Sequence, residues 1–502
     1  MCAAPRHTRL IGPRANTAAP VCYSFLPLPQ WVIAMHHVNC HHRVRQQSMP
    51  LPRRISSLAL LLALCLAGCG GGGSGGDTGS SSNALAPASC TTADQRIWLK
   101  SYMEDQYFWF DHLGTANEAA KDMNGYFSSL LYPVVDRYSF TESTTQFVQF
   151  YREGTFVGYG YSLAWSDAAR TILKVRTVEP LSPVGLAGLK RGDTIISIDG
   201  YTPAQIVAGT PGRVSSAGIS RTLVVGDATG ATRTLNVNSA EFAYVSVPAA
   251  SVLTQDIGGS SIKVGYMVYQ QFINASAGEL ATAFTSFAAA GVKQLIVDLR
   301  YNGGGSVAVA RDLASMLGGS SLAGKVFINL RYNTRHPENN STYGFAYSAQ
   351  LPAAPLNGLS RIIFITAEGT ASASELVING LKPYIPVVIV GTTTYGKPYG
   401  FMPVDACGLT YNTVNFESVN ALGEGRYDNG IAPTCEVADD LDHQLGDPAE
   451  KRLSAALQYI KTGSCAVPSA RTSVLKALAS STQRGGADNA FGEVPPQRMV
   501  AD

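Results

Sequence analysis

The chain has 502 residues, 45% of them hydrophobic, which is enough to bury more than one core and suggests two or three domains. Lysine and arginine number 38 against 36 aspartates and glutamates, a formal net charge of +2. This balance gives no support to a nucleic-acid-binding protein, in which basic residues gather on one face. The apolar content also argues against a wholly disordered chain.

The N-terminal region carries the pattern of an export signal. Arg53-Arg54 precede the apolar run LALLLALCLAG, and Cys69 and a Gly/Ser-rich stretch follow it. A basic stretch, ~7–15 apolar residues and small residues before a cut are typical of a secretory signal, whereas a membrane-spanning helix needs ~20 apolar residues. We therefore expect a signal peptide at residues 49–68, with a short buried helix as the alternative.

The end of this signal, LAGC at residues 66–69, resembles a bacterial lipobox, which implies that Cys69 is lipidated and becomes the first residue of the mature protein. A signal cleaved without lipid is the alternative. Residues 69–89 are then expected to be a flexible linker between a membrane surface and a folded domain. The resemblance to Gram-negative lipoproteins, with Gly70 after the cysteine, implies sorting to the outer membrane, facing the periplasm.

Residues 1–48 precede the signal, although a signal normally stands at the very start of a chain. We interpret them as an upstream extension that results from a start codon placed too far upstream. A metal site is the sharper alternative for the run HHVNCHH. Its ligands would be His36, His37, Cys40, His41 and His42.

Four cysteines follow Cys69, an even number that predicts disulfides in an exported protein. Cys407 and Cys435 bracket a segment with the appearance of a hairpin, while Cys90 and Cys465 flank the folded part at its two ends. Four cysteines allow three pairings. Of these we expect Cys407–Cys435 and Cys90–Cys465.

The first folded segment, residues 90–150, is predicted to be a small helical domain. Residues 92–95 fit a capping box, and apolar residues follow at i,i+4 spacing. Its aromatic residues are expected to belong to a core and not to a ligand site.

Residues 151–240 contain short apolar runs separated by turn signals, which predict strands. The stretch SPVGLAGLKRGDTIISIDG resembles the second half of a bacterial PDZ domain. That resemblance implies that a loop formed by Gly158, Tyr159, Gly160 and Tyr161 holds a peptide C-terminal carboxylate with its backbone amides, beside a sheet edge that takes the peptide as a strand. Alternatively, the glycines only mark a tight turn.

From residue 241 to 466 the pattern changes to apolar β-runs that alternate with helical stretches. The runs VGYMVYQQF, KQLIVDLR, RIIFITA and YIPVVIVG suit buried strands, with ELATAFTSFAAAG, VAVARDLASML and ASELVINGL as the helices between them. We expect an α/β core here. Residues 467–502 are rich in Ser, Gln, Gly and Pro and are predicted to be a disordered tail.

Two loops that follow buried strands could carry chemistry. In DLRYNGGGS, residues 298–306, successive glycines let the backbone approach a ligand and turn N–H groups toward a negative oxygen. The second loop opens the stretch EGTASASELVINGL, residues 368–381. Its Ser372 and Glu375 match a capping box, so this serine could simply cap a helix. However, a strand–Ser–helix–strand–Lys unit can return Lys397 beside the start of that helix.

The stretch GTTTYGKPYG, residues 391–400, has the G-x-x-x-x-G-K spacing of a phosphate loop. A phosphate loop needs a hydroxyl after the lysine and a helix whose N–H groups face the phosphates. Pro398 offers neither a hydroxyl nor an N–H. The nucleotide interpretation is therefore weak, and Lys397 needs another role.

Together the motifs D-L-R-x-N-G-G-G, T-A-S-A-S-E and G-T-T-T-Y-G-K resemble the carboxyl-terminal-processing (S41) serine peptidases over residues 90–466. This resemblance implies a ClpP/crotonase-like α/β core at residues 241–466 behind a helical segment and a PDZ-like β domain. It also implies that Ser372 is the nucleophile and Lys397 the general base. The N–H of Ala373 and that of Gly303 or Gly304 would form the oxyanion hole.

The proposed dyad sets a requirement on the lysine. A lysine takes the proton of a serine only when it is neutral, so its pKa must fall from ~10.4 to roughly 7–8, which burial and the lack of a carboxylate partner would achieve. One residue departs from the family pattern, since Phe401 stands where a glutamine normally orients the lysine. A Ser-His arrangement with His112, His336 or His443 is the less favoured alternative.

The sequence thus predicts a lipid-anchored serine endopeptidase that acts on polypeptides with free C-termini, without metal or cofactor and without nucleic-acid or nucleotide partners. The alternative is a non-catalytic protein of the same fold that holds peptides or cell-wall components.

Overall fold

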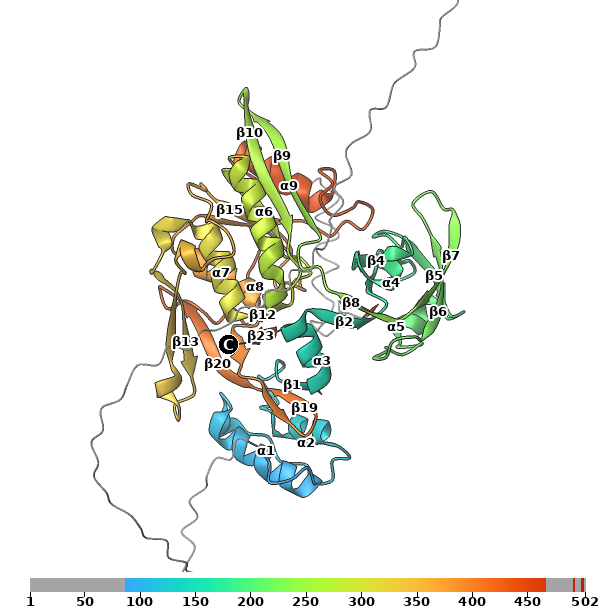
Figure 1. Ribbon diagram of the computed structural model, residues 1–502, viewed down its shortest axis with the longest axis vertical. Helices are drawn as coiled ribbons and strands as arrows, with labels where there is room; N and C mark the ends of the chain where they lie inside the picture. The colour runs from blue at the N-terminus through green and yellow to red at the C-terminus, as the bar shows by residue number, and fades with distance from the viewer. Residues whose placement is uncertain (1–85, 466–490, 493–497, 501–502) are drawn as a thin grey trace, which may run out of the picture. The chain divides into compact units, whose positions relative to one another are not determined.

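The computed structural model describes residues 86–465, and the backbone of two further segments, 491–492 and 498–500 (Figure 1). The predictions for residues 1–48, for the signal peptide with its lipidated Cys69, and for nearly all of the linker lie outside the described residues. Within the described part, no helix combines the length and the hydropathy that crossing a bilayer would require.

The first folded segment consists mainly of helices. It contains α1 (Thr92–Gln106), η1 (Phe110–His112), α2 (Met123–Leu130), β1 (Phe140–Ser143), α3 (Thr144–Phe147) and η2 (Val148–Glu153). The cap of α1 is one residue earlier than the sequence pattern indicates, because the Thr91 hydroxyl accepts the Asp94 N–H at 3.3 Å.

This segment shares its core with the end of the chain. Trp98, Leu99 and Met103 of α1 pack with Phe401 and Tyr411, which lie some three hundred residues later. The helices therefore do not close a core of their own. They cover strands of the α/β region.

The next segment forms a separate sheet around its own core. Its elements are β2 (Thr155–Gly158), β3 (Tyr161–Trp165), β4 (Leu173–Val178), α4 (Pro183–Leu186), β5 (Thr194–Ile198), α5 (Pro203–Val207), β6 (Ser220–Gly226), β7 (Thr232–Asn238) and β8 (Ala240–Ala243). β3 to β7 pair in sequence order as an antiparallel sheet, and β2 pairs with β8 where the chain enters and leaves the segment.

The α/β region is built on a six-stranded sheet in the order β21-β16-β15-β11-β10-β9. The strands are β9 (Ala249–Ile257), β10 (Ser260–Val268), β11 (Gln294–Asp298), β15 (Ile362–Thr366), β16 (Val387–Gly391) and β21 (Cys435–Glu436). All neighbours pair in parallel except β9 and β10. The four predicted apolar runs are β10, β11, β15 and β16, as expected for strands buried on both faces.

Helices cover both faces of this sheet (Figure 1). α6 (Ala277–Ala289), α7 (Val307–Gly318) and α8 (Ala373–Leu381), all three predicted, pack on one face, and α9 (Lys451–Thr462) packs on the other. Neighbouring residues divide between the two sides, since Leu295 and Val297 contact the α6–α8 core while Ile296 contacts the α9 core. The protein is therefore a mixed α/β fold.

A second six-stranded sheet, which the sequence did not indicate, has the order β12-β23-β17-β20-β13-β14. Its strands are β12 (Gly304–Ser306), β13 (Val326–Tyr332), β14 (Ser341–Gly344), β17 (Tyr399–Phe401), β20 (Val414–Asn420) and β23 (Arg498–Val500). The hairpin of β18 (Val404–Ala406) and β19 (Leu409–Asn412) pairs with β1. Short 3-10 turns complete the region at Asn274–Ser276, Ser320–Leu322, Pro337–Asn339 and Ser348–Gln350.

The disulfide pairing expected from the sequence is wrong. The bonds are Cys90–Cys407 and Cys435–Cys465. Cys407 lies in the tight turn of the β18–β19 hairpin, which packs beside the first helices, and Cys435 lies on the edge strand beside the end of α9. Spatial packing of distant segments decided the pairs, so position along the chain was a poor guide.

Removal of the two bonds should have unequal effects on stability. In the chain-entropy account, a bond that spans 317 residues restricts the unfolded chain more than one that spans 30, by about 2 kcal/mol. We expect Cys90→Ser/Cys407→Ser to lower the free energy of unfolding more than Cys435→Ser/Cys465→Ser in chemical denaturation. Equal losses, or the reverse order, would contradict this account.

Candidate active site

Ser372 lies in the turn between β15 and α8, and its backbone is strained. Its φ of +61° and ψ of −116° are uncommon for a residue with a side chain. The side chain is fully buried, and in the described part of the chain the hydroxyl oxygen has no hydrogen-bond partner. A serine that only capped the helix would bond an N–H of the first turn. The capping-box arrangement of Ser372 and Glu375 predicted from the sequence is nevertheless present, with the Glu375 carboxylate accepting the Ser372 N–H at 2.9 Å.

The carboxylate of Glu375, one turn into α8, holds two loops together. One of its oxygens accepts the Ser372 N–H at 2.9 Å and the Lys397 N–H at 2.9 Å. The other accepts the Gly396 N–H at 2.7 Å and the Thr394 hydroxyl. The serine turn and the lysine loop are thus fixed to the two oxygens of one buried side chain.

Lys397 is buried, with 1% of its surface exposed. Burial lowers the pKa of its amine to about 7, while the carboxylates of Asp136 and Glu375 act in the opposite direction. The sequence hypothesis of a desolvated lysine with a pKa of roughly 7–8 agrees with this value. Its amine nitrogen lies 3.7 Å from the centre of the Phe401 ring. The residue that departs from the family pattern therefore contacts the lysine through an aromatic face.

The glycine loop after β11 is tied to the serine turn through Asn302. The Asn302 carbonyl accepts the Ala371 N–H and the Ser374 hydroxyl, both at 3.1 Å. Its side-chain oxygen accepts the Gly304 N–H at 2.8 Å. Because the Gly304 N–H is engaged in this way, Gly303 is the stronger of the two candidate oxyanion donors.

Gly396 explains why the lysine loop has phosphate-loop spacing. Its φ is +87°, and a Cβ at this position would lie 2.4 Å from the Asp428 carbonyl oxygen. The Tyr138 hydroxyl donates to the Gly396 carbonyl at 3.0 Å, and Arg137 donates to the same oxygen at 3.2 Å. The glycine therefore allows close backbone packing around Lys397, a structural reason that needs no nucleotide.

Comparison with known proteins agrees with these motifs. Residues 263–437 match the model of the family described as Peptidase family S41. This region is similar to an S41 peptidase core and is named the S41 core for that similarity. The chain is 27% identical over 262 residues to the chloroplastic C-terminal processing peptidase of Tetradesmus obliquus, covering 49% of this chain and 52% of that protein. It is 25% identical over 296 residues to the carboxy-terminal processing protease CtpB of Bacillus subtilis, covering 57% and 56%.

Among solved structures, a putative S41 protease from Bacteroides fragilis superimposes with a TM-score of 0.61 and 26% identity, covering 73% of this chain and 97% of that chain. The chain spans about half the length of the curated relatives it matches.

Three loops of the S41 core meet at one edge of the central sheet. They follow the carboxyl ends of the neighbouring parallel strands β11, β15 and β16, which is where α/β sheets place ligand sites. The glycine loop, Ser372 and Lys397 come from these three loops. Within the described part of the chain, no cluster of side chains is suited to a metal ion.

Other predicted site residues lie apart from this edge. Gly158 to Tyr161 connect β2 and β3 in the separate sheet, where the side chains of Tyr159 and Tyr161 belong to the core. In the described residues the Ser372 hydroxyl is hydrogen-bonded neither to a histidine nor to Lys397, so this contact does not distinguish the Ser-His alternative from the Ser-Lys dyad. Two of the three candidates are instead bonded to carboxylates, His336 to Glu338 and His443 to Asp440.

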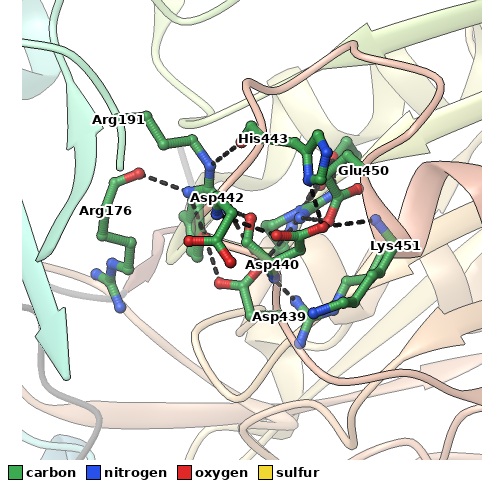
Figure 2. Close-up of polar contacts among 12 residues, drawn as sticks. Arg176, Arg191, Asp439, Asp440, Asp442, His443, Glu450 and Lys451 are labelled. Carbon is green, nitrogen blue, oxygen red and sulfur yellow. Dashed lines mark hydrogen bonds and ion pairs between the residues drawn. The ribbon is translucent and has the colours of Figure 1, made fainter. Parts of the chain in front are cut away.

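The arginines around the S41 core were not predicted from the sequence. Arg191, from the KRGD turn of the separate sheet, donates to the Asp440 carbonyl at 2.9 Å and to the Tyr301 hydroxyl at 2.8 Å (Figure 2). Arg300, which precedes Tyr301 in the chain, is buried and forms ion pairs with Asp298 and Glu450. The conformation of the glycine loop thus depends on charged contacts from both sides. For Arg300, the arginine of the D-L-R motif was the sequence signal that could have indicated this role.

We expect Glu375→Gln to impair the site although it preserves shape. Each carboxylate oxygen accepts at least one backbone N–H, so the amide nitrogen of glutamine would face a donor in either orientation. The expected loss is about 1–3 kcal/mol of stability, and about 10²-fold in kcat/KM if the loops separate. Thermal unfolding measures the loss of stability and peptidase assays measure the loss of kcat/KM. The control is Glu104→Gln, at an exposed position of α1. Wild-type values for Glu375→Gln would contradict the proposed role of the carboxylate.

The lowered pKa of Lys397 should also appear in stability. Between pH 7 and 10.5 the unfolded chain holds a proton that the folded chain releases, so the stability of the parent rises with pH. We expect Lys397→Met to be more stable than the parent near pH 7. The difference should shrink by roughly 1.4 kcal/mol per pH unit toward pH 10. Denaturant titrations of the parent, of Lys397→Met and of the control Lys100→Met across this pH range measure the free energies of unfolding. A difference between Lys397→Met and the parent that stays constant with pH would contradict the lowered pKa.

Proposed function

We propose that this protein is a serine endopeptidase of the C-terminal processing type, with Ser372 as nucleophile and Lys397 as general base. One observation carries the proposal. A buried lysine with a pKa of about 7 and a strained serine are fixed, through their backbone N–H groups, to the same carboxylate oxygen of Glu375. A lysine that is largely neutral at neutral pH can accept the proton of a serine hydroxyl.

The proposed mechanism is that of a serine nucleophile with a lysine base. Neutral Lys397 takes the Ser372 proton as the oxygen attacks the substrate carbonyl. The N–H groups of Ala373 and Gly303 stabilise the resulting oxyanion, and the start of α8 adds a favourable dipole. The protonated lysine then gives its proton to the leaving amine. In the second half, neutral Lys397 takes a proton from the water that attacks the acyl carbon. The ester bond to Ser372 then breaks, the lysine returns the proton to the Ser372 oxygen, and the carboxylic acid product leaves.

The aromatic contact at Phe401 replaces the amide that normally orients the lysine in this family. Phe401 packs against Phe140 and lies in the core beneath the first helices, so its ring position is fixed. The ring face limits the directions in which the amine can point. It also excludes water, and this desolvation favours the neutral amine, whereas the electron-rich ring face favours the ammonium that forms after proton transfer.

We further propose that the sheet of β3 to β7 is a PDZ-type domain that binds polypeptide C-termini. The edge of β3 and the turn at Gly158–Tyr161 are the elements that would bind the peptide strand and its carboxylate. Gly160 has a φ of +83°, and a Cβ there would lie 2.1 Å from that of Ser182. This close approach also satisfies the tight-turn alternative, so peptide binding needs its own test.

For location, we propose a lipid anchor at Cys69 and a site in the Gram-negative cell envelope, at the outer membrane and facing the periplasm. The two disulfides fit an oxidising compartment. Polypeptides are then the partners, with no nucleotide, nucleic acid, metal or cofactor involved.

A non-catalytic peptide-binding protein of the same fold is the second candidate, favoured by Phe401 in place of the usual glutamine. The two functions differ in turnover. The purified chain incubated with an unfolded protein should release fragments if the first function holds. Binding without fragments would support the second.

Substitution of the dyad gives the decisive comparison. We expect Ser372→Ala and Lys397→Ala each to lower kcat by at least ~10³-fold. The controls Ser348→Ala and Lys100→Ala, at exposed positions, should retain activity. In the parent, kcat/KM should rise about tenfold per pH unit below pH 7 and level off above it, because the base must be neutral. Activity that survives in both dyad variants would exclude this mechanism.

A further inference from the structure

A short strand from the end of the chain lies inside the catalytic region. β23 (Arg498–Val500) is inserted between β12 and β17, parallel to both (Figure 1). Arg498 pairs with Gly304, Met499 with Gly305, and Val500 with both Ser306 and Phe401. In the order of this sheet, β12 and β17 are joined through β23 and do not pair with each other.

The two strands beside β23 are those that border the proposed catalytic groups. β12 begins at Gly304, next to the candidate oxyanion donor Gly303. β17 begins two residues after Lys397 and contains Phe401, the ring that contacts the lysine amine. A strand in this slot therefore lies between the oxyanion loop and the strand of the base.

The same stretch of chain makes a second contact, at the sheet edge proposed to bind peptides. β22 (Phe491–Gly492) pairs antiparallel with β3, Phe491 opposite Leu163 and Gly492 opposite Ser162. Antiparallel pairing makes this segment run toward Tyr161 and the turn at Gly160. A peptide whose C-terminus was held by that turn would run in the same direction along the edge.

Both contacts use the backbone, which explains why no sequence pattern indicated them. Strand addition satisfies N–H and C=O groups at an open edge whatever the side chains are, so a stretch without apolar periodicity can still pair. The prediction of a disordered tail over residues 467–502 is therefore wrong at 491–492 and 498–500. Each contact is only two or three residues long. The two reinforce each other because they are on one chain.

We propose that β22 and β23 are ligands in cis for the two sites, β22 occupying the β3 edge and β23 the catalytic slot as a substrate would. The second half of this inference rests on the proposed peptidase function, because it takes the slot to be the substrate slot. Another polypeptide must displace these strands before it can be cleaved. If the slot were filled 90% of the time, the apparent KM for an external substrate would be about tenfold higher than in its absence.

Amide hydrogen exchange tests occupancy without relying on activity. The Ser372→Ala chain should be compared with the same chain lacking residues 491–502, so that no cleavage alters the segment. We expect the amides of β12, β17 and β3 to exchange faster when the segment is removed. Met499→Pro, which removes one N–H of β23, should have the same effect at β12, whereas Met499→Ala should retain the protection. Unchanged exchange in β12 and β17 on deletion would overturn the proposal.

Kinetics then test competition. In the active chain, deletion of residues 491–502 should lower KM for an unfolded polypeptide severalfold with little change in kcat, and a synthetic peptide of residues 488–502 should inhibit the truncated chain competitively. If exchange changes but KM does not, the competitive role is wrong. If exchange changes and neither chain cleaves, the segment still binds in cis and the failure lies with the peptidase function.

Discussion

The carboxylate of Glu375 is the interaction on which the proposed site depends. Its two oxygens accept N–H groups from the serine turn and from the lysine loop, which follow different strands of the central sheet. A buried carboxylate is stable only when its oxygens are satisfied, so the two loops cannot move apart without exposing a costly charge. The positions of Ser372 and Lys397 relative to each other are therefore set by one side chain on a rigid helix.

Desolvation of Lys397 requires parts of the chain that are distant in sequence. The first helices and β1 pack on Phe401 and Tyr399, and Tyr138 and Arg137 bond the backbone just before the lysine. Together they bury the amine and lower its pKa. The helical segment at the start of the chain is thus part of the site's environment, and the Cys90–Cys407 bond fixes it to the hairpin that follows β17. Stability and lysine chemistry depend on the same packed layer.

In the proposed function, a peptide binds at the second sheet of the α/β region, between β12 and β17. β12 and β17 present backbone groups to a slot that β23 fills in this structure, and the edge of β3 does the same for β22. Recognition through backbone hydrogen bonds tolerates many sequences. Such recognition suits the proposed peptidase function, in which diverse unfolded chains would be accepted. It would also make the protein's own chain a competitor for the same groups.

Local patterns in the sequence predicted the strands β10, β11, β15 and β16 and the helices between them, and the resemblance of three motifs singled out Ser372, Lys397 and the glycine loop as candidate site residues. Continuous apolar runs, helical periodicity and glycine-rich turns are local patterns, and local patterns can be read from neighbouring residues. The disulfide pairs, the core that the first helices share with β17, and the strand formed by residues 498–500 became visible only in the tertiary structure. The same is true of the hydrogen bond from the Lys397 N–H to Glu375 and of the contact between the Phe401 ring and the lysine amine. Each of these joins residues far apart in the chain, and such contacts arise from packing and backbone pairing, which leave no periodic trace in the sequence.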